Sequence, residues 1–297
     1  MANLILILST AIPAVAVLLS VMAWRLVRRY DRRRSPLTLK LQNLPGDSLR
    51  RAINKHDDAI HEATGLAALA GPIMLSAWLL SRLNRAGVDW STLRFGFGDA
   101  LFIGIGFLIL GGSIWRILSN AAKRRKYVEG LQAEQMVAQC LTPVTAEGGI
   151  VFHDFPTERG NIDHIVIGRS VVFAIETKSR KKPAATGKAA ARVRYDGRQL
   201  EFPRHTEFKA IEQAAYQAEW LSHYLGSAIG EPVRVVPLLA LPGWYVEDTN
   251  RTVRHPVMVT NCHNSRFMMS DKFGIPLQEP LRLRIAHALA EKYPQPD

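Results

Sequence analysis

The first 24 residues contain no charged side chain, and no other feature restricts the possible folds of this chain so strongly. As a helix, residues 3–24 would extend about 33 Å at about 1.5 Å per residue, which is enough to cross a bilayer core of about 30 Å. A cleaved signal peptide is the alternative. It fits less well, because no cation precedes the apolar stretch, the stretch is long and arginines follow it. We therefore expect residues 1–24 to form a transmembrane helix.

Two further apolar stretches precede residue 120, at residues 63–81 and 99–118. Gly71 and Pro72 lie inside the earlier one, but membrane helices tolerate these residue types better than soluble helices do. Buried core helices of a soluble protein are the alternative for both stretches. We expect an anchor of about three transmembrane helices, at residues 1–24, 63–81 and 99–118.

The basic residues predict how these helices would be oriented. The net charge is +12, and segment 25–62 holds ten Lys and Arg residues, whereas segment 82–98 holds only three. Cytoplasmic segments are enriched in Lys and Arg. We therefore expect an integral protein of a bacterial inner membrane, with its N-terminus outside and a short external loop at residues 82–98. The basic loop 25–62 and a domain at residues 127–297 would be cytoplasmic, and the loop would contact lipid headgroups.

From residue 127 the pattern is that of a mixed α/β domain. Apolar periodicity predicts helices at residues 128–141, 208–225 and 281–292, and strands at 150–155, 162–167, 171–177, 233–241 and 257–260. This order is typical of an α/β sandwich around a mixed sheet. Cys140 and Cys262 are the only cysteines and form no CxxC pair, so the sequence indicates neither a disulfide framework nor a zinc site.

The predicted hairpin 162–177 carries the residues with the clearest chemistry. If its turn is centred on Arg169 and Ser170, Asp163 faces Glu176 across the two strands, and Lys178 projects from the same face. Two carboxylates placed opposite each other destabilise a sheet unless a cation lies between them. Hard oxygen ligands favour Mg²⁺ or Mn²⁺.

A metal held by two carboxylates beside a lysine is suited to phosphodiester hydrolysis. The remaining residues of this face are apolar, so charge interactions there are strengthened: Ile165, Ile167, Val172 and Ala174. The alternative is a surface hairpin whose two carboxylates are separately solvated. We expect His164 to lie on the opposite face in a packing or hydrogen-bonding role, and His153 and Asp154 to form a solvated strand end.

Three segments resemble the nuclease-related domain (NERD) family of the PD-(D/E)xK nuclease superfamily: Gly130-Leu-Gln-Ala-Glu134, Gly160-Asn-Ile-Asp-His-Ile-Val166 and Val172-Phe-Ala-Ile-Glu-Thr-Lys178. The resemblance covers about residues 128–241. It implies a restriction-endonuclease-like α/β/α sandwich and Mg²⁺-dependent processing of DNA. It also implies that Glu134 is an additional metal or water ligand and that Gln213 is the glutamine of the helix after the hairpin. Ala133 departs from the family pattern, which usually has glycine there.

The sequence therefore favours a membrane-anchored nuclease that hydrolyses DNA with Asp163, Glu176, Lys178, Glu134 and Gln213. A non-catalytic nucleic-acid-binding module tethered to the bilayer is the alternative, and a membrane-embedded sensor is a weaker third reading. Segment 178–209 holds ten Lys and Arg against three acids, so it is a candidate phosphate-contacting surface, with a solvated loop as the alternative. Tyr195 and Phe202 within it are candidates for stacking on bases.

Overall fold

The computed structural model describes residues 42–82, 96–183, 191–250 and 255–293, together with seven helical positions between residues 15 and 26. The chain divides into two compact units. The helical unit contains Ile53–Arg125 together with Met1–Pro36, and the α/β unit contains Leu37–Ala52 and Lys126–Asp297.

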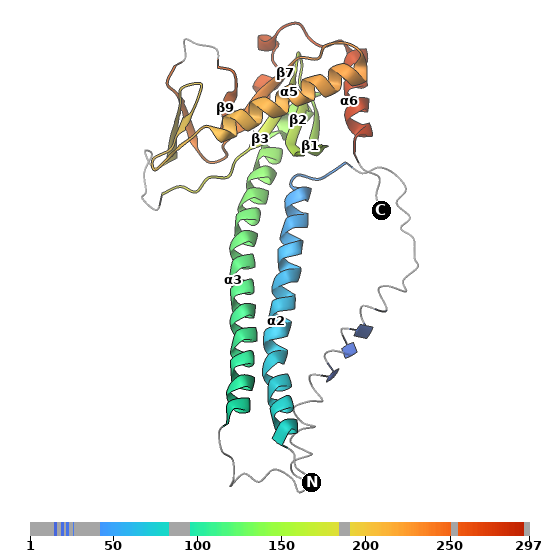
Figure 1. Ribbon diagram of the computed structural model, residues 1–297. Coiled ribbons are helices and arrows are strands. Elements are labelled where there is room, and N and C mark those ends of the chain that lie inside the picture. The colour runs from blue at the N-terminus through green and yellow to red at the C-terminus, as the bar shows by residue number, and fades with distance from the viewer. Residues whose placement is uncertain are drawn as a thin grey trace. The chain divides into compact units, whose positions relative to one another are not determined.

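Two long helices, α2 (Asp47–Arg82) and α3 (Phe97–Cys140), supply most of the described part of the helical unit, with residues 53–82 and 97–125 (Figure 1). Polar pairs join them in antiparallel order. Arg124 contacts Asp57 at 2.5 Å, and the Trp78 indole donates to Asp99 Oδ1 at 2.7 Å. Between these lies the pair of Arg116 and Glu62, at 2.9 Å.

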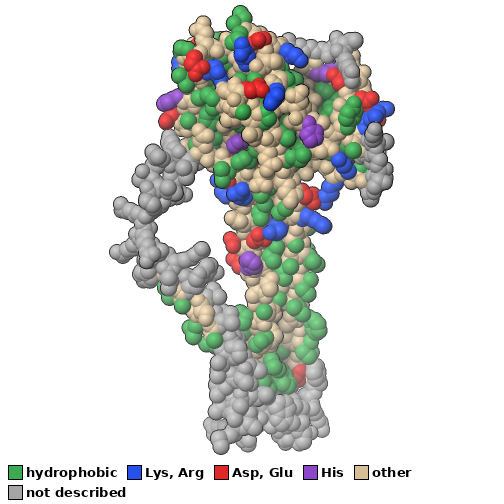
Figure 2. Space-filling model, turned by 180° about the vertical axis from the view of Figure 1, so that it is seen from behind, with side chains coloured by type: hydrophobic (Ala, Val, Ile, Leu, Met, Phe, Trp, Pro, Cys, Tyr) green, Lys and Arg blue, Asp and Glu red, His purple; other side chains and the backbone are tan. Residues whose placement is uncertain are grey.

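On the face that Figure 2 shows, apolar side chains gather along the described part of this unit. On α3, Phe107, Leu108 and Trp115 are each at least 70% exposed. A soluble monomer rarely exposes such a large apolar area to water. By length and composition, α2 and α3 are the two described helices that are apolar enough to cross a membrane.

The expectation of three membrane helices needs correction. The described residues contain two long apolar helices, whereas most of the expected helix 1–24 lies outside the described residues. Within the expected basic segment 25–62, the described residues from Asp47 onward are helical and belong to α2. The expected helices 99–118 and 128–141 are one helix, α3. The segment between them is rich in Ala, Lys and Arg, which are strong helix formers, so nothing ends the helix there.

The main sheet of the α/β unit has five strands in the order β1-β2-β3-β7-β9. Neighbouring pairs β1–β2 and β2–β3 are antiparallel, whereas β3–β7 and β7–β9 are parallel, so the sheet is mixed. The strands are β1 (Ile150–Thr157), β2 (Gly160–Ile167), β3 (Val172–Thr177), β7 (Val235–Ala240) and β9 (Met258–Thr260).

Helices cover both faces of this sheet. On one face, the hairpin residues Ile165, Ile167, Val172 and Ala174 pack in one core with α5 (Lys209–Ile229) and α6 (Glu279–Glu291). On the other face, Val166, Phe173 and Ile175 pack with the end of α3, the short helix α4 (Thr142–Ala146) and η3 (Arg266–Met269). A further turn, η4 (Asp271–Phe273), follows η3. The predicted alternation of the hairpin is confirmed by this division into two cores.

A second, four-stranded sheet has the order β6-β5-β4-β8 and was not expected. Its strands are short: β4 (Arg192–Tyr195), β5 (Leu200–Glu201), β6 (Thr206–Glu207) and β8 (Tyr245–Asp248). Tyr195 and Phe202 are only 2% and 4% exposed and belong to its core with Trp244. The expectation that they stack on bases is therefore wrong, because burial withholds both rings from a ligand.

Candidate functional site

The register of the β2–β3 hairpin is the one that the sequence predicted. His164 pairs with Ile175 and Ile167 with Val172, so the same register places Asp163 opposite Glu176. Both carboxylates are buried, with exposed fractions of 6% and 2%. The backbone register therefore places both side chains on the same face of the hairpin.

Each carboxylate has a defined set of donors. The backbone N–H of Thr177 donates to Asp163 Oδ2 at 2.6 Å. The Lys178 ammonium donates to Glu176 Oε1, and it also donates to Gln213 Oε1 at 2.9 Å. Lys178 therefore joins Glu176 and Gln213 in one hydrogen-bonded group, and Asp163 is held beside it by the backbone of Thr177, which lies between Glu176 and Lys178.

Glu134, the fifth expected residue, reaches the same cluster from α3. It is 6% exposed, and its Oε2 has no hydrogen-bond partner among the described residues. Burial, followed by the nearby charges of Asp154 and Glu176, raises the pKa of Glu134 to about 8. Burial together with the charges of Glu176 and Glu134 also raises the pKa of Asp163 well above its ordinary value. The acids destabilise one another's charged forms, as expected for carboxylates with too few counter-charges.

Gln217 is a site residue that the sequence reading missed. Its amide donates to Glu176 Oε2 at 2.6 Å and to the backbone oxygen of Asn161 at 3.1 Å. It lies one helical turn after Gln213 on α5, so the i, i+4 spacing was the available signal. Glu176 is therefore held by a lysine on one oxygen and by a buried amide on the other.

Asp154 was expected at a solvated strand end, and this expectation is wrong. Its side chain is 1% exposed, and its φ of 47° lies in the left-handed region, which is uncommon for a residue other than glycine. Asn161 donates to Asp154 Oδ1 at 2.6 Å and, over a longer 3.4 Å, to Asp163 Oδ1. Asp154 is therefore a fourth acid of the cluster.

The two histidines of the β1–β2 pair contact each other. His153 Nδ1 and His164 Nδ1 lie 2.8 Å apart, and His164 is fully buried. Burial, followed by the neighbouring His153, lowers the pKa of His164 to about 3, and burial alone lowers the pKa of His153. The packing and hydrogen-bonding role expected of His164 agrees with these contacts.

The donor set fits a divalent cation by its chemistry, although the ligands are not assembled. Within the described residues, no group of three or more His, Cys, Asp or Glu side chains is already arranged to hold a metal ion. However, buried carboxylate oxygens are hard ligands, and Glu134 Oε2 lacks any described partner. The raised pKa values indicate that the cluster lacks positive charge. A bound ion would require the side chains of Asp163, Glu176 and Glu134 to converge.

Many cations of segment 178–209 are already paired with acids of the same unit. Arg180 pairs with Glu207, Lys181 contacts Glu129 at 2.8 Å, and Arg192 and Arg194 contact Glu247 at 3.3 and 3.5 Å. The charge available to a phosphate backbone is thus smaller than the sequence count of ten suggested. Arg198 and Arg204 are exposed cations of this segment with no ion pair among the described contacts.

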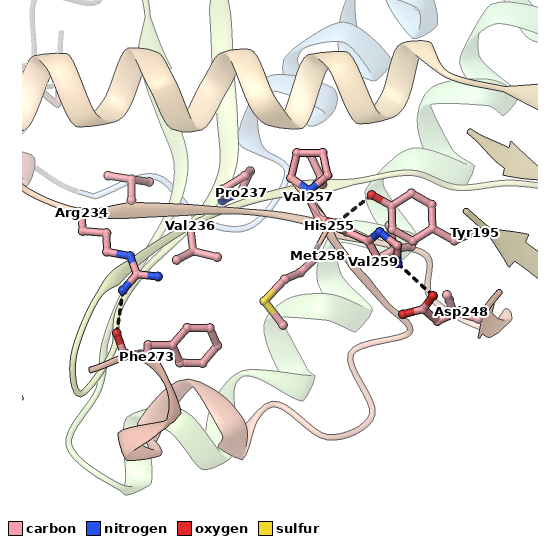
Figure 3. A pocket seen from close by; sticks show the side chains of 13 residues that line it. Tyr195, Arg234, Val236, Pro237, Asp248, His255, Val257, Met258, Val259 and Phe273 are labelled. Atoms are coloured by element: carbon pink, nitrogen blue, oxygen red, sulfur yellow. Dashed lines mark hydrogen bonds and ion pairs between the residues drawn. The ribbon is translucent and has the colours of Figure 1, made fainter. Parts of the chain in front are cut away.

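A cavity of about 510 Å³ lies elsewhere in the α/β unit, beside the first residues of β7 and β9 (Figure 3). Arg234 donates to the backbone oxygen of Phe273 on one side, and His255 contacts Asp248 at 2.9 Å on the other. None of the clustered acids lines this cavity. It is therefore separate from the candidate metal site.

Comparison with known proteins gave one family match, which covers part of the chain. Residues 129–242 match the family model of the nuclease-related domain, NERD. The matched NERD segment includes Glu134, Asp163, Glu176, Lys178 and Gln213. Comparisons with curated proteins and with solved structures gave no significant match.

Proposed function

We propose that the α/β unit is a Mg²⁺- or Mn²⁺-dependent nuclease that hydrolyses phosphodiester bonds of DNA. The observation that carries this proposal is the buried group of Asp163, Glu176 and Glu134 with one lysine. Folding gains nothing from burying three mutually repelling carboxylates, so a ligand that supplies positive charge is the physical reason for keeping them together. The NERD match agrees with a nuclease-related function.

Each residue has a distinct role under this proposal. Asp163, Glu176 and Glu134 would hold the ion, which when bound supplies Lewis acidity and charge stabilisation for a phosphate. The Lys178 ammonium, oriented by Glu176 and Gln213, offsets negative charge that develops on the phosphate during hydrolysis. Gln217 fixes the second oxygen of Glu176. The flanking helices that bury the hairpin exclude water and strengthen these interactions. This arrangement supports assignment to the PD-(D/E)xK superfamily.

We further propose that the two apolar helices anchor the protein in a lipid bilayer, with the α/β unit on the cytoplasmic side. The Lys and Arg excess of segment 25–62 over segment 82–98 supports this orientation. Impermeant thiol labelling of single cysteines introduced in the two segments, on a background without Cys140 and Cys262, tests it. Labelling from the outside should reach segment 82–98 and not segment 25–62; the reverse pattern contradicts the orientation.

Cleavage by the full chain in detergent or nanodiscs is the decisive test. Single-stranded, double-stranded and structured DNA should be cleaved with Mg²⁺ or Mn²⁺ and not with EDTA. Asp163→Asn, Glu176→Gln and Lys178→Ala should each abolish cleavage. Asp271→Asn, Glu201→Gln and Lys272→Ala change exposed residues of the same types and should leave it intact.

The same assay identifies the alternative functions. Metal-independent DNA binding that Asp163→Asn leaves unchanged, without cleavage of any substrate, would indicate a non-catalytic binding module. Cleavage confined to RNA would keep the chemistry and change the substrate. If all three site variants retain wild-type cleavage, the assignment of the site is wrong.

A further inference from the structure

A short segment far from the NERD region in sequence lies directly on the acidic cluster. Within the α/β unit, the Asn43 amide donates to the backbone oxygen of Asp154 at 2.7 Å. The backbone N–H of Ser48, in the first turn of α2, donates to Asp154 Oδ2 at 2.6 Å. Arg51 approaches the same carboxylate at 3.8 Å. Three groups of segment 43–51 therefore converge on one buried acid, more than 100 residues later in the chain.

Gly46 lies in close contact with side chains of α3. It is buried with a φ of 75°, a conformation that side chains other than glycine rarely adopt. A Cβ atom on Gly46 would overlap the Leu131 side chain and would lie 3.4 Å from Glu134 Oε2. The turn is closed by the Asp47 side chain, which accepts from the Leu44 N–H at 2.7 Å. Its shape is therefore fitted to the helix that carries Glu134.

Asp154 connects segment 43–48 to the predicted metal ligands through hydrogen bonds. Its Oδ2 faces the first turn of α2, whereas its Oδ1 accepts from Asn161. The same Asn161 amide reaches Asp163 Oδ1, and its backbone oxygen accepts from Gln217, which holds Glu176. Ser48, Asp154 and Asn161 thus form a continuous chain of contacts that ends at Asp163.

We propose that segment 43–48 is a built-in part of the candidate site, and that Asp154 is a positioning residue that couples this segment to Asp163. This inference rests on the proposed function. It adds that residues outside the matched NERD segment fix the site. Loss of such supporting contacts around a metal site typically costs about 10–100-fold in metal affinity or activity.

The test uses the full chain in detergent with three variants of the coupling. Asn43→Ala removes one donor, Gly46→Ala displaces the turn and Asp154→Asn removes the charged acceptor. The matched controls are Asn54→Ala and Gly65→Ala, because Asn54 is exposed on α2 and a Cβ on Gly65 would meet no atom within 4 Å. Mn²⁺ affinity is measured by electron paramagnetic resonance, and hydrogen exchange is followed at residues 160–164 and at β7.

The expected result is a Mn²⁺ affinity about 10–100-fold lower in the three variants than in wild type and the controls. Exchange at residues 160–164 should become faster in Asn43→Ala while β7 stays protected, which separates a lost coupling from a lost fold. Unchanged Mn²⁺ affinity together with unchanged exchange at residues 160–164 would overturn the inference.

Failure of the proposed function has a different signature. If the wild-type chain neither binds Mn²⁺ nor cleaves DNA, the nuclease proposal fails. Hydrogen exchange then decides the coupling alone: faster exchange at residues 160–164 in Asn43→Ala retains it, and unchanged exchange rejects it.

Discussion

Replacing Glu134 by glutamine should change how the stability of the α/β unit depends on pH. The raised pKa means that the folded state binds the Glu134 proton more tightly than the unfolded state does. The stabilisation from this proton is fully present below pH about 4.5, and it is lost as the pH rises through about 8. Glu134→Gln has no ionisable group at this position, so its stability lacks this dependence.

The size of the effect follows from the difference between the unfolded and folded pKa values of Glu134. A group that titrates near 4.5 when unfolded and near 8 when folded loses about 3–4 kcal/mol of stabilisation between pH 5 and pH 8. That corresponds to a few hundredfold in an unfolding equilibrium. The buried amide introduced by the substitution carries its own cost of about 1–3 kcal/mol, but that cost does not vary with pH. The difference between the two pH profiles therefore isolates the carboxylate.

The loss of stability between pH 5 and pH 8 can be measured by hydrogen exchange of the β3 amides in the metal-free full chain, after correction for the intrinsic exchange rates. Amides of core strands are suitable because they report the highest opening free energies. Wild-type protection should fall a few hundredfold more than that of Glu134→Gln between pH 5 and pH 8. Glu201→Gln, at an exposed position, should follow the wild-type profile. Parallel profiles for wild type and Glu134→Gln would show that Glu134 is ionised at ordinary pH, and the account of an acidic cluster short of positive charge would be refuted.

Three further predictions concern the same unit. At pH 8, Mg²⁺ at a hundred times its Kd should stabilise the wild-type unit by about 2.7 kcal/mol, and Asp163→Asn should lose most of this gain in the same exchange measurement. Gln217→Ala should lower the rate of DNA cleavage about 10–100-fold. The loss should be larger than that caused by Gln213→Ala, because Gln217 is the buried donor to Glu176. Equal losses in the two variants would contradict this ranking. Tyr195→Phe removes the hydroxyl that donates to the Val257 oxygen and should cost about 1 kcal/mol of stability, with DNA binding unchanged in a filter-binding assay.

The sequence was sufficient for the parts of the site that depend on local geometry. A two-residue periodicity and one turn determine which strand residues face each other, so the register around Asp163 and Glu176 followed from residue numbers alone. The same reasoning placed His164 on the other side of the sheet. The face of Lys178 could also be predicted, because side chains two residues apart along an extended chain project from the same side, and Lys178 lies two residues after Glu176.

Contacts between distant segments could not be obtained this way. Asp154 has the residue type and position of a solvated strand end, and it is buried because Asn43 and Ser48 approach it from more than 100 residues away. Tyr195 and Phe202 lie in a basic, glycine-containing segment that resembles a loop, and only pairing with β8 turns it into a sheet with a core. Neither the contacts of Asp154 with Asn43 and Ser48 nor the pairing of β4 with β8 produces a periodic pattern in a single sequence.

The boundaries of the NERD match do not coincide with a physical boundary of the site. Residue 129 falls inside the continuous helix α3, five residues before Glu134. The acids and their donors come from four separate stretches of the chain, around residues 43–48, 134, 154–178 and 213–217. A buried acid whose donors are removed retains its desolvation cost without compensation. A fragment that begins at the family boundary would therefore leave Asp154 facing the space of the missing turn, and its inactivity would not speak against a nuclease function of the intact chain.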